Sequence, residues 1–573
     1  MGVRMQRFLA GLAGLAIGLT PWSGQHAEAA WTDPASGSTA VVASAHVAAS
    51  EAGRAMLAAG GGAVDAAVAM SLALSVVEPW GSGLGGGAFA VVHVDGQTLS
   101  LDMRETAPSA ASADMFVRDG RVVPGESTTS ARAAAIPGLV RGLATLHARF
   151  GRLSWPQVVA PAVALARDGV VVTPRMRGAI AEALPGMNPA ARAIFAPGGE
   201  APPVGSRLVQ ADLAATLARI AETRGEDFYT GETARRLVAA VGAEGGLWTA
   251  SDLAGYAVRE RTAVRGTWRG LDVVSMGPPS SGGLLLLQML GVLERLPTGK
   301  PQTGAAATWR GADALHTLAE VMKRAFAERA LGLGDPDFVP VDTDRFLGGA
   351  TLDRLARDVS ASRRATPAGN LSPLKVRPAD RPDTSHLAVL TAGGDAVALT
   401  QTINLRFGTG RIAADTGVVL NNEMDDFSAQ PGVPNAFGLV GDAGNAIAPG
   451  KRPLSSMTPT LVLRDGRAVG AFGSPGGSRI ITTTLQTLLR LVVDGLDAAS
   501  ALGAERVHHQ WYPDELMVEA TALSPETEAA LRARGHALRV VPDMGNAMVL
   551  WRRADGTLEG AADPRGEGAA LGL

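Results

Sequence analysis

The sequence predicts an α+β protein that is larger than one ordinary domain. Its 573 residues are 46% apolar, which is enough for a large core, and the length alone suggests two or more folded units. Apolar residues recur at helical spacing through much of the first half of the chain. Alternating β-branched residues predict a two-stranded hairpin after residue 384.

In the first half we expect two helices within residues 44–75, separated by the glycine run 60–62. Pro79 ends this helical stretch, and a glycine-rich loop leads into an apolar strand at residues 88–94. The following region is mostly helical and is interrupted by prolines, with one strand expected at residues 271–275. This half is therefore mixed but helix-rich.

The clearest boundary in the chain lies at residues 361–383. This segment contains four prolines, several arginines and few large apolar residues, as an exposed linker does. Directly after it, residues 386–390 and 396–404 form the predicted hairpin, with a turn at Gly393 and Gly394. Thr384 is thus placed where a linker becomes a strand.

The charge balance restricts the partners. The 52 basic and 55 acidic residues leave a net charge of -3, which argues against a nucleic acid or a membrane surface as partner. A small neutral or zwitterionic molecule fits this balance better.

The first 29 residues have the pattern of a signal peptide. Arg4 and Arg7 precede the apolar stretch 8–19, and residues 27–29 provide a small-x-small cleavage pattern. An uncleaved anchor is the alternative, but about 12 apolar residues are fewer than the roughly 20 that span a bilayer. We expect a periplasmic or secreted protein without a membrane span in its mature form. The absence of cysteine excludes disulfides and a thiol nucleophile.

Two motifs that suggest cofactors have simpler explanations. Residues 81–86 match the dinucleotide pattern G-x-G-x-x-G, but that pattern requires a strand before the loop and a helix after it, and here the order is reversed. Adjacent side chains such as His508 and His509 diverge, and no further ligand completes a metal site. We therefore predict a structural turn, hydrogen-bonded histidines, no metal and no cofactor.

The second half contains a specific series of segments in a fixed order. They are Asp383-Thr384-Ser385-His386, residues 400–404, 407–410, 421–427, 453–457 and 473–479. In the first half, residues 83–89, 101–105, 252–256 and 279–283 agree with the same pattern. Taken together, these segments resemble the gamma-glutamyltranspeptidase family over nearly all of the mature chain.

The resemblance implies an N-terminal nucleophile hydrolase fold, a four-layer αββα sandwich. It also implies that the chain cuts itself between Asp383 and Thr384, which gives a large chain of residues 30–383 and a small chain of residues 384–573. A threonine hydroxyl is a poor nucleophile without a base. Cleavage would give Thr384 a free α-amino group with a pKa of about 8, which can accept the proton of its own hydroxyl.

The resemblance assigns further catalytic roles. Thr402 would orient the Thr384 hydroxyl, and Gly476 and Gly477 would provide backbone N–H groups for the oxyanion, each contributing about 3 kcal/mol in comparable sites. Without the family pattern, the glycine pair would equally fit a simple turn and Thr402 an ordinary strand residue.

A gamma-glutamyl group carries an α-carboxylate and an α-ammonium, so a selective site needs partners for both. By resemblance, Arg104, Ser455 and Ser456 would bind the carboxylate, and Asn404 would add a hydrogen bond to the glutamyl part. Glu423 and Asp426 would bind the ammonium. Outside this family, Asp425-Asp426 would be interpreted as a surface turn.

Residues 431–438, which we call the lid, form a proline- and glycine-rich segment that can cover a pocket. The segment is similar to the lid of the family, and relatives that act as cephalosporin acylases tend to lack it. Phe437 stands where many members have tyrosine, which leaves the lid's closing contact and the balance of hydrolysis and transfer open. Asp383 and Ser385 flank the cut at positions that vary in the family.

The resemblance implies a glutathione hydrolase and gamma-glutamyltransferase. Its substrates would be glutathione and other gamma-glutamyl compounds, and its acceptors would be water, amino acids or dipeptides. One alternative is a beta-lactam side-chain acylase on the same scaffold. A second alternative, from another class, is a binding protein that keeps the pocket but remains unprocessed.

Overall fold

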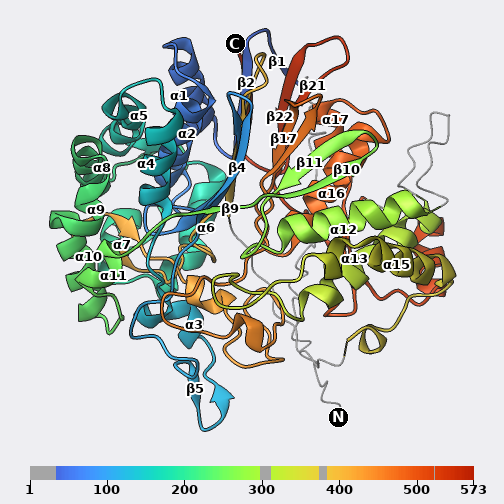
Figure 1. Cartoon of the computed structure of the whole chain (residues 1–573). Helices are drawn as coiled ribbons and strands as arrows, with labels where there is room; N and C mark the ends of the chain where they lie inside the picture. Colours follow the sequence, from blue (N-terminus) through green and yellow to red (C-terminus); the bar gives the residue numbers. More distant parts are fainter. Residues whose placement is uncertain (1–33, 297–310, 373–383, 522) are drawn as a thin grey trace, which may run out of the picture.

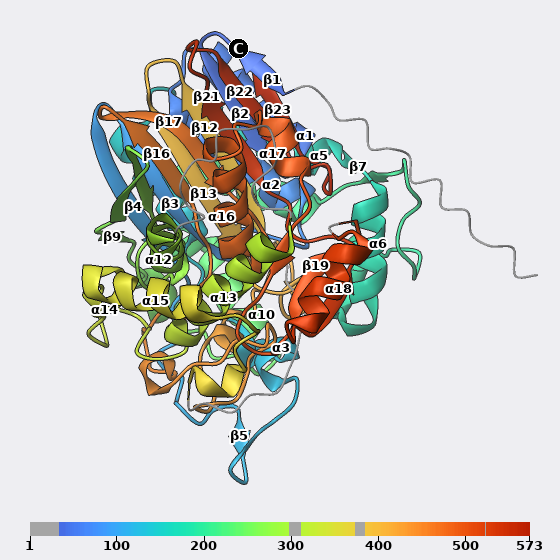
Figure 2. The same ribbon diagram turned by 90° about the vertical axis from the view of Figure 1, so that its right-hand side faces the viewer.

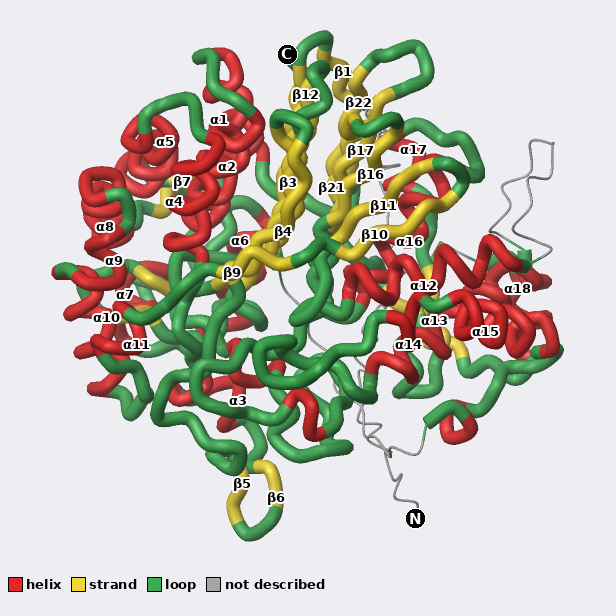
Figure 3. Tube along the Cα trace, in the orientation of Figure 1, coloured by secondary structure: helices red, strands yellow, loops and turns green. Residues whose placement is uncertain are grey.

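The computed structural model describes residues 34–296, 311–372, 384–521 and 523–573. Two seven-stranded sheets stack face to face between two outer layers of helices (Figure 1). In Figure 3 the strands form a central double layer, in yellow, with helices on both sides. The predicted αββα sandwich is confirmed.

The first sheet is antiparallel throughout, and its strands come from both ends of the chain. Its order is β1 (Ala35–Gly37), β22 (Leu558–Ala562), β21 (Met548–Arg552), β17 (Arg467–Gly473), β16 (Thr460–Arg464), β11 (Leu271–Ser275) and β10 (Val264–Trp268).

The second sheet places strands from before and after residue 384 side by side. Its order is β23 (Ala569–Gly572), β2 (Ala40–Ser44), β12 (Ser385–Thr391), β13 (Ala396–Thr402), β3 (Gly87–Val94), β4 (Gln97–Met103) and β9 (Arg259–Arg261). The segments on either side of residue 384 are therefore not separate folding units, and the expectation of two or more such units from length is wrong. Each sheet needs strands from both segments.

Each sheet is covered on its outer face by its own layer of helices. The helices outside the second sheet are α1 (Val47–Ala58), α2 (Ala63–Val77), α4 (Leu139–Phe150), α5 (Trp155–Asp168) and α8 (Ala211–Thr223). Those outside the first sheet, which face the viewer in Figure 2, are α12 (Gly282–Arg295), α13 (Ala312–Arg329), α15 (Gly349–Ala361), α16 (Arg479–Val492) and α17 (Ala498–Gly503).

Shorter elements surround this frame. The helices are α3 (Glu126–Thr129), α6 (Pro174–Ala183), α7 (Pro189–Phe195), α9 (Glu226–Thr230), α10 (Glu232–Ala243), α11 (Ala250–Ala254), α14 (Asp344–Leu347) and α18 (Pro525–Ala533). The strands are β5 (Val117–Arg118), β6 (Arg121–Val122), β7 (Val170–Val171), β8 (Arg207–Leu208), β14 (Ile412–Ala413), β15 (Val418–Val419), β18 (Val507–His508), β19 (Leu516–Glu519) and β20 (Leu538–Val541).

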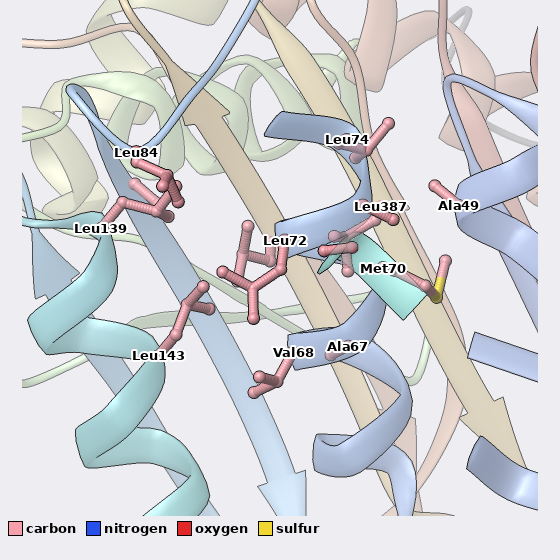
Figure 4. Close-up of a cluster of buried hydrophobic side chains, with 14 of the residues drawn as sticks. Ala49, Ala67, Val68, Met70, Leu72, Leu74, Leu84, Leu139, Leu143 and Leu387 are labelled. Atoms are coloured by element: carbon pink, nitrogen blue, oxygen red, sulfur yellow. The ribbon is translucent and has the colours of Figure 1, made fainter. Parts of the chain in front are cut away.

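Helix α2 is buried along its whole length, because it lies between the second sheet and the helices α1, α4 and α5. Its alanines allow close approach, and Figure 4 shows Val68 and Leu72 of α2 among leucines of α4 and β12. Gly53 of α1 is in close contact with α2, since a Cβ at this position would lie 2.4 Å from the sulfur of Met70. The two helices and the strand predicted for this region are confirmed.

The predicted hairpin is the centre of the second sheet, because β12 pairs with both β13 and β2. Its register pairs Ser385 with Gln401, which brings Thr384 opposite Thr402. The second strand ends at Thr402, two residues before its predicted end. Asn404 has a φ of 76°, outside the β region, and its N–H donates to the Thr402 hydroxyl at 2.8 Å.

Two of the predicted processing features lie outside the described residues: the signal peptide at residues 1–29 and Asp383 at the cleavage site. Helix α15 ends at Ala361, where the predicted linker begins. In the part of the chain that the structure describes, no helix has the length and apolar character needed to cross a membrane.

Candidate active site

One buried cavity brings together nine of the ten residues to which a catalytic or binding role was assigned from the sequence. These nine are Arg104, Thr384, Thr402, Asn404, Glu423, Asp426, Ser455, Ser456 and Gly477. The tenth, Gly476, lines an adjoining groove. The cavity is also lined by Arg329, Phe437, Leu439, Met457 and Ile480.

The glycine-rich segment 81–86 packs directly behind the proposed nucleophile. A Cβ at Gly81 would lie 3.2 Å from the Ser385 hydroxyl and 3.3 Å from the Thr384 carbonyl oxygen. A Cβ at Gly86 would lie 2.0 Å from the carbonyl oxygen of Thr402. Only glycine allows this approach, so the segment is the structural turn that the sequence predicted.

A buried hydrogen-bond network supports the strand that carries Thr384. The Ser385 hydroxyl donates to Glu78 at 2.7 Å, and the Ser82 hydroxyl donates to Ser385 at 3.1 Å. The Gln401 amide donates to Ser82 at 2.8 Å. Ser385 therefore has a structural partner, and this network was not recognised in the sequence because its members are far apart in the chain.

The glycine pair adopts backbone conformations that side chains disfavour. Gly476 has a φ of 131° and Gly477 a φ of 57°, and both precede the first residue of α16, Arg479. Gly477 faces the cavity that contains Thr384, whereas Gly476 faces the groove. The pair thus forms part of the wall between the two.

Arg104, which was predicted to bind the α-carboxylate of the substrate, contacts the two residues that were predicted to bind its α-ammonium. The Arg104 guanidinium donates to Glu423 through one nitrogen and to Asp426 through the other. Both ion pairs are buried, and Glu105 lies 3.7 Å from the same guanidinium. Arg104 directly follows β4, whereas the short 3-10 helix Glu423–Asp426 carries both acceptor carboxylates.

Burial raises the pKa of the three carboxylates around the Arg104 guanidinium. Burial, opposed by Arg104, raises the pKa of Glu105 to about 7 and raises the pKa of Glu423 and of Asp426 above their ordinary values. These carboxylates in turn raise the pKa of Arg104, against the effect of burial. Glu105 belongs to a family segment, but the sequence gave no reason to assign it a role.

Arg329 is a second buried guanidinium in the cavity, and sequence reasoning missed it. It is the last residue of α13, and it donates to the Ser281 hydroxyl at 2.9 Å and to the Ser456 hydroxyl at 3.4 Å. Burial, opposed by Asp426, lowers its pKa to about 10, so it is charged at neutral pH. No motif surrounds Arg329, and only the fold brings it to the site.

The turn at residues 279–283 holds the two serines in place. The backbone N–H of Ser455 donates to the Pro279 carbonyl at 2.8 Å, and the Ser281 hydroxyl donates to the Ser455 carbonyl at 2.8 Å. The Ser280 hydroxyl donates to the Met457 carbonyl at 2.6 Å. This segment matched the family for a structural reason, because it fixes Ser455 and Ser456.

The lid lies over the cavity and contacts Asp425 and Asp426. The side-chain amide of Asn435 donates to Asp426 at 3.0 Å, and the backbone N–H of Ala436 donates to Asp425 at 2.9 Å. Phe437 is buried and lines the cavity. Phe437 thus lacks the hydroxyl of a tyrosine, but neighbouring residues of the lid make polar contacts. Asp425 is buried and holds the lid, so the surface-turn alternative is wrong.

The paired histidines are bound by protein groups. His508 contacts the Thr482 hydroxyl at 2.8 Å and Gln510 at 3.1 Å, and burial lowers its pKa to about 3. His509 accepts from the backbone N–H of Trp511 at 3.2 Å. Within the described ranges, no three His, Asp or Glu side chains are grouped to hold a metal ion.

Comparison with known proteins identifies the family. The model of the family described as Gamma-glutamyltranspeptidase matches residues 49–573. The glutathione hydrolase proenzyme of Escherichia coli (strain K12) is 43% identical over 531 residues, which cover 92% of this chain and 90% of that protein. The glutathione hydrolase proenzyme of Pseudomonas aeruginosa is 41% identical over 528 residues, which cover 90% and 91%.

Solved structures agree. The crystal structure of cephalosporin acylase from Bacillus halodurans has a TM-score of 0.83 at 27% identity, and the match covers 94% of this chain and 97% of that one. The fold and the site thus define an N-terminal nucleophile hydrolase. The chain belongs to the gamma-glutamyltranspeptidase family, which confirms the predicted resemblance.

The raised carboxylate pKa values predict a pH-dependent affinity for L-glutamate, measured as its inhibition constant against a gamma-glutamyl anilide. A carboxylate with a raised pKa takes up a proton at a higher pH than usual, and the protonated form no longer attracts an ammonium. Glutamate should therefore bind more weakly as the pH falls, at pH values where an ordinary carboxylate is still charged, by up to about tenfold per pH unit.

Glutarate, which lacks the ammonium, is the matched control. Its affinity for the enzyme should not weaken over the same pH range. Equal pH profiles for glutamate and glutarate would contradict the prediction that Glu423 and Asp426 bind the ammonium.

Proposed function

We propose that this chain is cut before Thr384 by its own chemistry and that the new N-terminal threonine then hydrolyses gamma-glutamyl amides and transfers their gamma-glutamyl group. The family match and the glutathione hydrolase relatives confirm the enzyme class that the sequence predicted, a glutathione hydrolase and gamma-glutamyltransferase. The observation that carries the residue assignments is the single cavity lined by Thr384, Thr402, Gly477 and the charged residues around Arg104.

In the first step the Thr384 hydroxyl oxygen attacks the amide carbonyl of the donor. The free α-amino group takes the hydroxyl proton, and Thr402 orients the hydroxyl. The N–H groups of Gly476 and Gly477 stabilise the negative oxygen of the tetrahedral intermediate. The amide C–N bond then breaks, the leaving nitrogen takes the proton, and a gamma-glutamyl ester of Thr384 remains.

In the second step water, an amino acid or a dipeptide attacks this ester. The α-amino group of Thr384 removes a proton from the attacking group, the ester bond breaks, and the hydroxyl of Thr384 regains a proton. Water gives glutamate, and an amine gives a new gamma-glutamyl amide.

Recognition of the donor requires the ion pairs of the cavity to be exchanged. The α-carboxylate would take the place of Glu423 or Asp426 on Arg104 and would accept from the hydroxyls of Ser455 and Ser456. The α-ammonium would bind the carboxylates that are released, and Asn404 would hydrogen-bond the glutamyl part. Each protein charge keeps an opposite charge beside it, which limits the cost of burial.

The proposed maturation gives a large chain of residues 30–383 and a small chain of residues 384–573. Their shared sheet supports this assignment, because β12 and β13 lie between β2 and β3 and hold the two chains together after the cut. We also propose, from the leader at residues 1–29, that the enzyme acts in the periplasm or in the medium.

Wild-type protein is expected to give two bands on a denaturing gel, with Thr384 as the first residue of the smaller one. Thr384→Ala should remain one inactive chain, because it lacks the hydroxyl that attacks the preceding peptide bond. Thr384→Ser keeps the hydroxyl and should still be cut. N-terminal sequencing is the measurement, and an active chain that stays intact would contradict the mechanism.

Gly477→Val is expected to lower kcat by about a hundredfold, with a much smaller change in KM, because the displaced N–H acts mainly in the transition state. Gly495→Val is the control, since Gly495 also has a positive φ, of 67°, but has no neighbour within 4 Å of an added Cβ. Chain cleavage and unfolding temperature are measured first. Equal kcat values for the two variants would remove Gly477 from the oxyanion site.

Asp426→Asn is expected to lower kcat/KM for a gamma-glutamyl anilide by roughly thirty-fold to several thousand-fold, because losing one partner of a buried ion costs about 2 to 5 kcal/mol. A glutaryl anilide keeps the terminal carboxylate but lacks the ammonium, so its turnover should change little. Arg104→Ala should impair both substrates. Two chains should still form in each variant.

The same pair of substrates separates this function from a beta-lactam side-chain acylase. A wild-type enzyme that prefers glutaryl over gamma-glutamyl amides would support the acylase, and an unchanged preference in Asp426→Asn would show that this carboxylate does not bind the ammonium.

A further inference from the structure

A large groove of about 950 Å³ adjoins the cavity that contains Thr384. The two hollows share a thin wall, because the chain passes from one lining to the other between consecutive residues at four places. These places are Asn404–Leu405, Asn422–Glu423, Ala436–Phe437 and Gly476–Gly477. A molecule attached to a gamma-glutamyl group in the cavity can extend only a short distance before it reaches this wall.

One face of helix α6 lines the groove. Arg175, Gly178, Ala179 and Glu182 have the spacing of a single helical face. A Cβ at Gly178 would meet nothing within 4 Å, so the groove is open above this face. The small residues leave room for the backbone of a short peptide, and the arginine at the start of the helix supplies a charge beside it.

Arg175 differs from other arginines of the groove in its partners. Arg406 is paired with Glu182, and Arg565 is paired with Glu519 and Asp563. In the described parts of the chain, the Arg175 side chain has no carboxylate within 4 Å, and its buried Nε has no hydrogen-bond partner. Glu567 accepts from the backbone N–H of Arg175, not from its guanidinium. The Arg175 guanidinium thus has donor capacity that no described protein group uses.

The chemistry of the reaction identifies the anion. When the gamma-glutamyl group occupies the cavity, the amine part of the donor lies on the other side of the scissile bond. In glutathione this part is a dipeptide that ends in a carboxylate, and amino acid and dipeptide acceptors carry the same group. A guanidinium binds a carboxylate through two parallel hydrogen bonds. The early turn of α6, with its positive dipole end, also favours an anion.

We propose that the groove binds the amine part of donors and acceptors and that Arg175 selects amines with a free carboxylate. This proposal rests on the proposed function, because it assigns the second half of the same substrate. The donor's gamma-glutamyl half contacts the buried charges around Arg104, and its amine half contacts the groove. The leaving amine departs through the groove, and the acceptor attacks the ester from the same side.

The test compares two donors in wild-type enzyme and in Arg175→Ala. Glutathione has a carboxylate on its leaving group, whereas a gamma-glutamyl anilide has none. Loss of a charged hydrogen bond in this partly exposed position should lower kcat/KM for glutathione about tenfold, mainly through KM, and leave the anilide unchanged. Arg175→Lys should recover part of the loss.

Transfer provides the second readout, with glycylglycine and glycylglycine amide as acceptors. Wild type should prefer the free carboxylate, and Arg175→Ala should lose this preference. Arg177→Ala is the matched control, because Arg177 lies on the same helix, is exposed and does not line the groove. Chain cleavage and unfolding temperature show whether each variant is folded.

The outcomes separate the two proposals. If Arg175→Ala affects neither donor, the groove assignment is wrong and the proposed function stands. If it impairs both donors equally, Arg175 supports the fold of the site and does not select the amine. If wild type cleaves neither donor, the proposed function itself fails.

Discussion

The pairing of β12 with β13 at the centre of the second sheet is the constraint on which the site depends. In the proposed mature enzyme, Thr384 is both the nucleophile and a chain terminus, so it must be free at its α-amino group and yet held in position. The hairpin meets both needs, because Thr384 lies just outside the first hydrogen-bonded pair and directly opposite Thr402. The glycine segment 81–86 and the network around Ser385 then close the space behind it. In the proposed mature enzyme, this burial would suppress the fraying that is usual at a chain terminus.

The charged cluster follows a second physical rule, that a buried ion needs a partner. Arg104, Glu423 and Asp426 neutralise one another, and the lid adds a hydrogen bond from Asn435 to Asp426. A zwitterion can replace these pairs one for one, whereas a singly charged molecule would leave an ion without a partner. The proposed selectivity for gamma-glutamyl groups would thus follow from charge balance in a medium of low dielectric constant.

The thin wall between cavity and groove connects this selectivity to the reaction. Gly476 and Gly477 stand at one of the points where the two linings meet, and the lid residues Ala436 and Phe437 stand at another. The proposed oxyanion donors therefore lie at the border between the part of the substrate that stays bound as an ester and the part that leaves. A cavity for the acyl group can remain small and specific, because the variable amine part occupies the open groove.

The sequence by itself identified the family and the enzyme class of this protein. The linker before Thr384, the hairpin after it, the glycine pair and the charged segments were all recognisable, because each is local or follows the others in a fixed order. The tertiary structure decided what no local pattern can encode. It brought Arg329 from the end of α13 to Ser456, paired Arg104 with the carboxylates expected to serve a different end of the substrate, and placed Arg175 on the adjoining groove. These contacts join residues that are more than a hundred positions apart, and only the stacking of sheets built from both segments of the chain brings such residues within hydrogen-bonding distance.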